Sequence, residues 1–84
     1  DNAVADYEKV MVLDDTYFTA YYNRGLCFYN QKNYQNALRD FNTTLARQSD
    51  YKLGYYNRGN THLRLKNYQK ALADYDEAAR LGYQ

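Results

Sequence analysis

The pentapeptide Tyr-Tyr-Asn-Arg-Gly decides the fold, because it occurs at residues 21–25 and again at residues 55–59. A second segment, Lys-Asn-Tyr-Gln, occurs at residues 32–35 and 66–69. Both segments recur after 34 residues. A fixed period of this length indicates a recurring supersecondary unit that buries its apolar surface by stacking on its neighbours.

The repeat extends beyond these two segments. Ala37, Leu38 and Asp40 match Ala71, Leu72 and Asp74 at the same shift, and Ala3, Asp6 and Tyr7 supply a partial copy before them. The sequence therefore predicts a single repeat segment over residues 1–84, with a half repeat at 1–17 and full repeats at 18–51 and 52–84. Because the chain begins at Asp1 rather than at a methionine, we expect it to be a piece of a longer repeat array.

Apolar residues in the second half of each repeat recur at steps of three and four, the spacing of one helix face. They are Tyr34, Ala37, Leu38, Phe41 and Leu45, and then Tyr68, Ala71, Leu72, Tyr75 and Ala79. Proline is absent. The pattern predicts five helices, at residues 2–14, 17–31, 34–48, 51–65 and 68–81. Asn33 and Asn67 are expected to cap helix starts with their side-chain oxygens, and Gly82 to end the last helix.

Composition excludes several classes of partner. Eleven basic and ten acidic side chains leave a formal charge of +1, too small a field to gather nucleic acid or an anionic membrane. No run approaches the roughly 18 to 20 uninterrupted apolar residues of a membrane span. The sequence therefore predicts no nucleic-acid partner and no membrane partner.

The candidate catalytic and metal-binding residues each have a structural explanation. His62, the only histidine, takes the place of a packing aromatic residue, and Ser49, the only serine, falls in a predicted turn without a base nearby. Cys27, the only cysteine, is expected to be buried and unreactive. A glycine-rich phosphate loop and metal-ligand spacing are both missing. We predict no catalytic residues, no metal and no cofactor.

The repeats resemble tetratricopeptide repeats, whose 34-residue helix-turn-helix pattern reads W-x2-L-G-x2-Y, then A-x3-F, then P. The corresponding residues are Tyr21, Arg24, Gly25, Phe28, Ala37 and Phe41 in the middle repeat, and Tyr55, Arg58, Gly59, His62, Ala71 and Tyr75 in the last. The resemblance implies an all-α, right-handed helix-turn-helix repeat stack of about two and a half repeats. The sequence departs from the pattern where the closing proline is replaced by Asp15, Ser49 and Tyr83.

Arginine replaces the leucine that precedes each glycine in the family pattern. An unpaired guanidinium buried at the helix crossing would cost several kcal/mol. We therefore predict that Arg24 pairs with Asp6 or Asp40. By the same reasoning, Arg58 pairs with Asp40 or Asp74. The alternative is that both arginines face solvent without a partner.

In the family that the chain resembles, the first helix of each repeat lines a concave groove. The resemblance places eight residues there: Tyr22, Leu26, Tyr29, Asn30, Tyr56, Asn60, Leu63 and Arg64. It implies a non-catalytic scaffold that holds a protein or peptide through apolar contacts and a few amide hydrogen bonds. The alternative for these tyrosines is that they pack against neighbouring helices. Family members that grip a chaperone's carboxylate tail have lysine and two asparagines where this chain has Tyr22, Leu26 and Asn57, so that clamp is not expected.

A second function from a different class stays open. The repeats are expected to leave apolar residues uncovered at both ends: Val4, Tyr7, Val10 and Met11 at one, and Leu72, Tyr75 and Ala79 at the other. Uncovered apolar faces favour end-to-end contact. The chain is therefore also a candidate assembly element that stacks on further repeats or forms a homo-oligomer through its terminal helices. Non-specific RNA binding is a third and weaker hypothesis, resting on exposed aromatic residues and Arg64.

Overall fold

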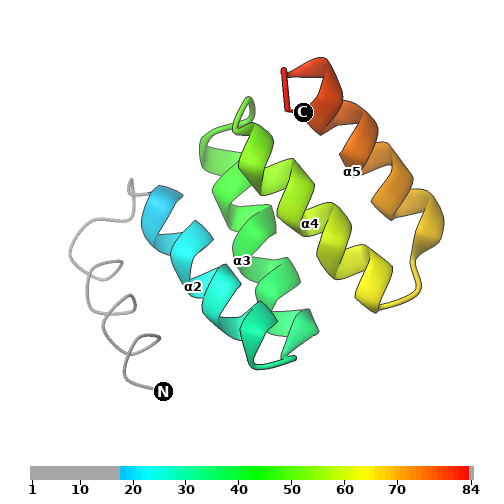
Figure 1. Ribbon diagram of the computed structural model, residues 1–84. Helices are drawn as coiled ribbons and strands as arrows, with labels where there is room; N and C mark the ends of the chain where they lie inside the picture. The colour runs from blue at the N-terminus through cyan, green and yellow to red at the C-terminus, as the bar shows by residue number, and fades with distance from the viewer. Residues whose placement is uncertain (1–17, 84) are drawn as a thin grey trace.

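A computed structural model describes residues 18–83 of the chain. Four helices follow one another in this part, α2 (Phe18–Asn30), α3 (Tyr34–Arg47), α4 (Lys52–Arg64) and α5 (Tyr68–Arg80) (Figure 1). Each lies within one residue of a predicted helix at both ends. The predicted count of five is corrected to four helices within residues 18–83, because the helix predicted at residues 2–14 lies outside the described residues.

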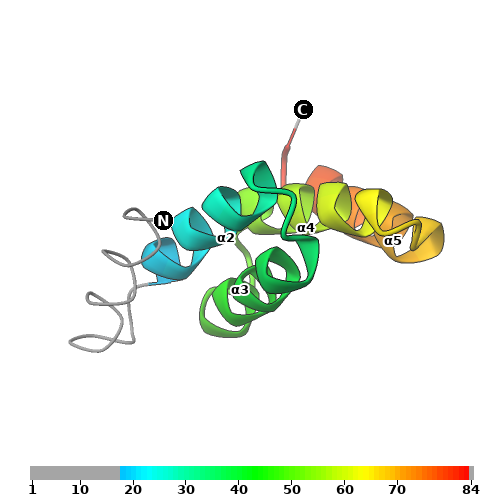
Figure 2. The same cartoon turned by 90° about the horizontal axis from the view of Figure 1, so that it is seen from below.

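The helices pack in sequential pairs. α2 packs against α3, α4 packs against α5, and the two pairs meet where α3 and α2 contact α4. Seen from below, α2 and α4 lie side by side and α3 packs on one side of them (Figure 2). The first helices of the two repeats therefore share a face that α3 does not cover.

Glycines allow the two helices of each pair to approach closely. A Cβ added at Gly25 would lie 2.7 Å from Cε1 of Phe41, and one added at Gly59 would lie 2.9 Å from Cε1 of Tyr75. Real Cβ atoms do not approach other atoms this closely. Each glycine thus gives up about 1 kcal/mol of helix propensity and admits an aromatic ring from the partner helix.

The core of the α2–α3 pair is a cluster of Phe28, Ala37 and Phe41, the last two with no exposed surface. Buried Thr44 donates its hydroxyl hydrogen to the backbone oxygen of Asp40 at 2.8 Å, so its polar atom is satisfied within α3. The prediction of a buried thiol at Cys27 is wrong, because this side chain is half-buried on α2.

Three helices end in the same way, with one residue in the left-handed conformation. These residues are Lys32 (φ 62°), Lys66 (φ 64°) and Gly82 (φ 101°). At the end of α5, the amide of Gly82 donates to the carbonyl of Ala79 and that of Tyr83 donates to Ala78. This is the Schellman arrangement, so Gly82 ends α5 as predicted.

The predicted side-chain caps at Asn33 and Asn67 are wrong. Both residues precede a helix, but neither side chain makes a capping hydrogen bond. Each residue also closes the Schellman motif before it, where its amide donates to the carbonyl of Phe28 or His62 at 2.8 Å. This second role holds the backbone near φ −90° and ψ 70°, outside the extended conformation typical of a capping residue.

Candidate functional site

Paired charges join the two helices of each repeat. Arg24 donates from Nε and Nη2 to the two carboxylate oxygens of Asp40 at 2.7 and 2.6 Å. Arg58 binds Asp74 in the same way at 2.9 and 2.8 Å. The predicted pairing of both arginines is therefore confirmed. Arg58 also donates from Nη1 to the side-chain oxygen of Asn42 at 2.9 Å, which joins α4 to α3.

Two tyrosine hydroxyls link the first helices of the two repeats. The hydroxyl oxygen of Tyr22 on α2 accepts a hydrogen bond from Nδ2 of Asn57 on α4 at 2.8 Å. At the C-terminal ends of the same two helices, the hydroxyl oxygen of Tyr29 accepts a hydrogen bond from Nε of Arg64 at 3.1 Å. Both bridges leave the hydrogen of the tyrosine hydroxyl available to another acceptor.

Tyr22 lies between aromatic rings. Its ring meets Tyr51 edge to face at 5.1 Å between centroids and is tilted against Phe41 at 5.9 Å. Burial, and after it the nearby Tyr51 hydroxyl, raises the pKa of Tyr22, whereas the hydrogen bond from Asn57 lowers it. Tyr22 therefore stays neutral as a donor and acceptor near neutral pH.

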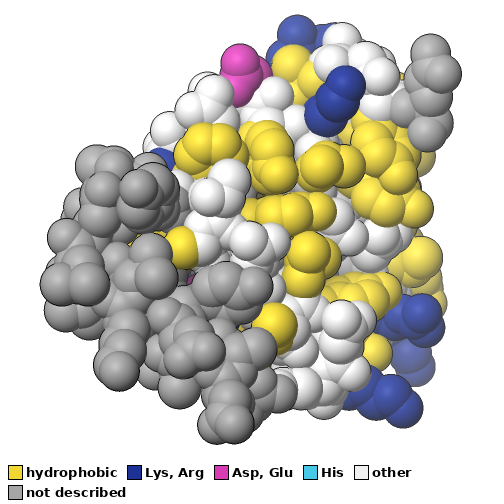
Figure 3. Space-filling view, turned by 60° about the vertical axis from the view of Figure 1, so that its left-hand side comes forward, with side chains coloured by type: hydrophobic (Ala, Val, Ile, Leu, Met, Phe, Trp, Pro, Cys, Tyr) yellow, Lys and Arg dark blue, Asp and Glu magenta, His cyan; other side chains and the backbone are white. Residues whose placement is uncertain are grey.

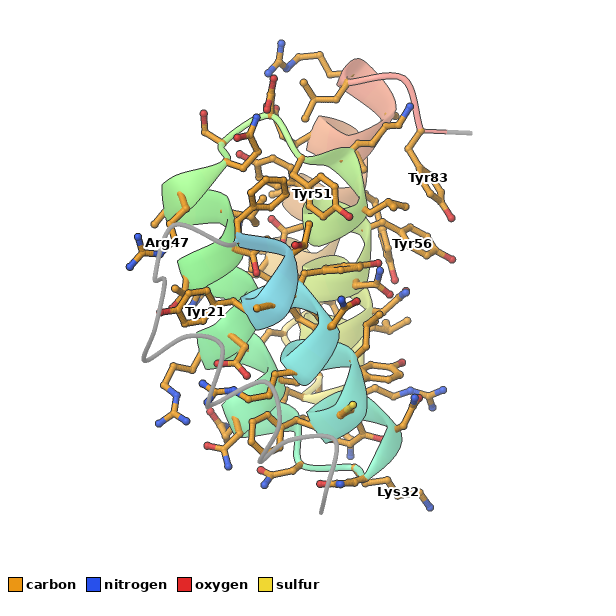
Figure 4. All side chains as sticks on the ribbon, turned by 90° about the vertical axis from the view of Figure 1, so that its left-hand side faces the viewer. Tyr21, Lys32, Arg47, Tyr51, Tyr56 and Tyr83 are labelled. Atoms are coloured by element: carbon orange, nitrogen blue, oxygen red, sulfur yellow. The ribbon has the colours of Figure 1, made fainter. Side chains whose placement is uncertain are left out.

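Tyr56 is the counterpart of Tyr22 one repeat later, but its surroundings differ. Its ring stacks on Tyr83 at 4.2 Å with an interplanar angle of 20°, and it is tilted against Tyr75 at 5.9 Å. In Figure 4 the Tyr56 and Tyr83 side chains point to the same side, away from the side on which Tyr21 and Arg47 lie. Tyr56 and Tyr83 thus form an aromatic pair on one face.

The remaining residues predicted for the groove differ in exposure. Leu26 and Asn60 are half-buried, Asn30 and Arg64 are exposed, and Leu63 has 46% of its surface exposed. The hydroxyl of Tyr75 donates to the side-chain oxygen of Asn60. On the face shown in Figure 3, hydrophobic side chains form a band down the middle, and Lys and Arg side chains lie toward the margins of the face.

All eight predicted groove residues belong to α2 or α4. Of these, Tyr29 and Arg64 are joined directly by a hydrogen bond. Sequence reasoning missed Tyr51 and Tyr83, which pack on Tyr22 and Tyr56. These two residues are 32 positions apart and fall outside the 34-residue match. Each of them follows the second helix of a repeat, where the chain turns back toward the first helices. That position could have identified them from the sequence.

His62 has the packing role that the sequence predicts. It is 7% exposed, and its Nε2 lies 3.8 Å from the Asp74 carboxylate. Burial lowers its pKa, which the Asp74 charge opposes. Within residues 18–83, no three histidine, cysteine, aspartate or glutamate side chains are grouped as metal ligands. In the same range, no helix is long and apolar enough to cross a membrane.

Comparisons with known proteins agree with this architecture. The family model described as "Tetratricopeptide repeat" matches residues 18–51 and 53–81. No curated protein sequence matches the chain.

Among solved structures, the chain is similar to the first TPR of Spaghetti (RPAP3), which was solved bound to the HSP90 peptide SRMEEVD. The two are 25% identical, with a TM-score of 0.92 over 94% of this chain and 63% of that one. It also resembles two structures of MamA, at 24% and 17% identity and TM-scores of 0.91 and 0.87. These matches cover 94% and 93% of this chain, but only 46% and 43% of the MamA chains. Because the family model matches two consecutive repeats that make up most of the sequence, the chain belongs to the tetratricopeptide repeat family.

Proposed function

We propose that the chain is a non-catalytic scaffold that binds a protein or peptide on the face formed by α2 and α4. The observation that carries the proposal is Leu63, which leaves 46% of its surface exposed on α4. The same two helices carry the half-buried tyrosines Tyr22, Tyr29 and Tyr56. Aromatic side chains together with an exposed aliphatic one are typical of peptide-binding surfaces.

The hydrogen bonds of this face suit a peptide backbone. Tyr22 and Tyr29 each accept a hydrogen bond from α4, so each hydroxyl hydrogen is free to be donated to a peptide carbonyl. Asn57 donates both of its Nδ2 hydrogens, to Tyr22 and to the carbonyl of Leu53 at 3.0 Å, so its side-chain oxygen is left to accept a peptide amide. An extended peptide supplies both kinds of group.

Peptide binding by a similar protein supports the proposal. The first TPR of Spaghetti, which resembles 94% of this chain, was solved with a bound peptide. The sequence of that peptide is not transferred to this chain, because Tyr22 and Leu26 replace the lysine and asparagine that hold a carboxylate tail in such family members.

A peptide-display selection tests the proposal. The segment is screened against a random twelve-residue library, and the enriched peptides are titrated against variants by calorimetry. Leu63→Ser is expected to weaken binding at least fivefold, since an interface residue of this kind is worth about 1 kcal/mol or more. Leu72→Ser is the matched control, because Leu72 is 61% exposed on α5. Equal losses in the two variants, or no enriched peptide, would contradict the proposal.

Tyr56→Ala separates binding from packing on the same face. We expect it to weaken an enriched peptide by about 1 kcal/mol or more with helicity unchanged. Its contacts with Tyr83 and Tyr75 give it a structural share as well. Equal losses of affinity and of thermal stability would mark Tyr56 as a core residue.

The outer face of α5 favours assembly as a second candidate function. Tyr68 is 60% and Leu72 61% exposed, whereas their counterparts Tyr34 and Leu38 on α3 are half-buried. Among the described helices, α4 packs against α3, but α5 contacts only α4. We propose that a helix resembling α4, from a further repeat or from a second copy of the chain, covers this face.

Sedimentation equilibrium tests whether a second copy provides that helix. The wild-type segment is expected to show a mass that rises with concentration, and Leu72→Lys is expected to lower it to that of a monomer. Leu63→Lys is the control, because it places the same charge on α4. A constant monomer mass for the wild type up to about millimolar concentration would contradict self-association.

A further inference from the structure

His62 and Arg58 converge on one carboxylate oxygen. His62 is 7% exposed on α4, and its Nε2 lies 3.8 Å from Oδ2 of buried Asp74 on α5. The same Oδ2 accepts a hydrogen bond from Nε of Arg58 at 2.9 Å, while Nη2 of Arg58 donates to Oδ1 at 2.8 Å. A group that is always cationic and a group that becomes cationic in acid therefore share one buried anion.

The repeat at residues 18–51 has no titratable group at the position of His62. Phe28 lies 34 residues earlier and belongs to the buried cluster with Ala37 and Phe41. The guanidinium carbon of Arg24 lies 5.7 Å from the centroid of the Phe28 ring, a cation–π distance that favours the charge. Because a protonated histidine at this place would repel the arginine instead, the two repeats should respond differently to acid.

The neutral ring of His62 fits its surroundings. Nδ2 of Asn67 lies 3.4 Å from Nδ1 of the ring. An amide nitrogen can only donate, so Nδ1 accepts and the ring hydrogen is on Nε2, facing Asp74. Burial lowers the pKa of His62, and the Asp74 charge opposes this shift. The ring is therefore neutral at neutral pH, with its hydrogen directed at the carboxylate.

A proton added to Nδ1 disturbs this arrangement. The new N–H points at the amide nitrogen of Asn67, which offers hydrogens and no acceptor. Within residues 18–83, the charged groups that act on the ring are Asp74 and Lys70 on α5 and Arg58 on α4, and both cations disfavour the charged ring. Asp74 is the anion that compensates an imidazolium here. Protonation therefore draws the ring toward a carboxylate that Arg58 occupies.

Arg58 is the partner that can leave. Its side chain is 23% exposed, whereas the side chains of His62 and Asp74 are 10% and 8% exposed. A guanidinium at this exposure can turn into solvent, but a charged imidazole that stays buried needs an anion. Competition for the carboxylate is therefore decided in favour of the protonated ring.

Arg58 also joins the two repeats. α4 lies between α3 and α5 (Figure 1), and Nη1 of Arg58 donates to the side-chain oxygen of Asn42 on α3 at 2.9 Å. We infer that His62 is an acid-operated release for this link: its protonated ring claims the Asp74 carboxylate, frees Arg58 from both of its partners, and lets α4 shift against α3. The hydrogen bonds from α4 to the tyrosines of α2 do not involve Arg58 and stay in place. The release operates whether or not the face formed by α2 and α4 binds a peptide.

Nuclear magnetic resonance on the 84-residue segment tests the release. The ring nitrogen shifts of His62 are followed from about pH 7.5 to about pH 4.5, and hydrogen exchange at Nε of Arg58 is measured relative to that at Nε of Arg24. We expect the exchange ratio to rise about tenfold at the midpoint of the His62 titration, a usual size for coupling between two sites. A ratio that stays constant across the range, or unfolding before Arg58 is released, overturns the inference.

Two variants place a neutral side chain at position 62. His62→Phe gives Arg58 the aromatic neighbour that Arg24 has, and His62→Gln keeps a polar group beside Asp74. Each is expected to hold the exchange ratio within about twofold across the same range. A tenfold rise that persists in either folded variant would assign the acid response to another group and overturn the role of His62.

Residual dipolar couplings measure the angle between the α2–α3 pair and the α4–α5 pair. Asn42→Ala removes the link between α3 and α4 at every pH, so at neutral pH it is expected to change this angle in the same direction as acid does in the wild type. Gln35→Ala, at an exposed position on the same helix, is the control and is expected to leave the angle unchanged. A wild-type angle that is the same in acid and at neutral pH overturns the proposed shift of α4.

Discussion

Asp40 is 1% exposed and accepts two parallel hydrogen bonds from Arg24, at 2.7 and 2.6 Å. The pair lies between α2 and α3 where the family pattern has leucine in place of the arginine. Asp74 and Arg58 repeat the geometry between α4 and α5. A buried charge pair of this kind adds little when both partners are present, but it makes each partner depend on the other.

Removal of one partner should therefore be costly. Asp40→Ala is expected to lower the free energy of unfolding by about 3 to 5 kcal/mol, because it removes the buried carboxylate that accepts two hydrogen bonds from Arg24 at the helix crossing. Urea unfolding followed by circular dichroism measures the loss. Asp76→Ala, at an exposed position on α5, should change the free energy by no more than about 0.5 kcal/mol. A loss below about 1 kcal/mol for Asp40→Ala would mean that the arginine finds solvent at little cost.

Gly25→Ala should destabilise the protein, although alanine is the better helix former. The added methyl group would lie 2.7 Å from Cε1 of Phe41, whose side chain is fully buried and has no room to move. We expect a loss of about 1 to 3 kcal/mol in thermal or urea unfolding. Phe41→Leu alone should also destabilise, but the double variant should lose less than the two single variants combined. Strict additivity would show that the two positions do not compete for space.

Lys66→Gly should stabilise the protein. Lys66 has a φ of 64°, which costs a residue with a Cβ about 1 to 2 kcal/mol, and part of this cost is offset by the lower chain entropy of lysine in the unfolded state. A net gain of up to about 1 kcal/mol is expected in the free energy of unfolding. Lys70→Gly, inside α5, serves as the opposite control and should lose about 1 kcal/mol. The same sign in both variants would contradict the left-handed conformation at Lys66.

The free energy of unfolding should fall when the pH is lowered below the usual pKa of an exposed histidine. Burial lowers the pKa of His62 below the usual value of about 6.5, so the unfolded chain takes up a proton before the folded chain does. The contribution of His62 is therefore fully present above about pH 6.5 and is lost as the pH falls toward the folded pKa. Urea unfolding at pH 7.5 and pH 5.5 measures it. His62→Phe should reduce the pH dependence in this window, and an unchanged slope would assign it to other groups.

Most of the fold could be predicted from the repeat period. Matching residues 34 positions apart predicted four helices to within one residue at each end, and the replacement of leucine by arginine predicted the pairs with Asp40 and Asp74. Both predictions rest on features that recur, because a repeated irregularity such as Arg24 and Arg58 requires a repeated compensation.

Details of the turns and of the contacts between repeats were harder to predict from the sequence. The roles of Asn33 and Asn67 were mistaken, because the Schellman motif before each residue occupies its amide and fixes its backbone. The groove residues could be assigned to helices, but the Tyr29–Arg64 bridge depends on how far α4 is shifted along α2. That shift follows from packing of whole helix pairs, which periodicity alone does not fix.

The links between the two repeats run from α4 to two different helices. Tyr22–Asn57 and Tyr29–Arg64 join it to α2, whereas Arg58–Asn42 joins it to α3. Because the three links connect α4 to two helices of the preceding repeat, together they restrict rotation of one repeat against the other and so help to set the curvature of the stack. A ligand that displaces Arg64 from Tyr29 would therefore break one of these links, and the angle between the two repeats would then be free to change.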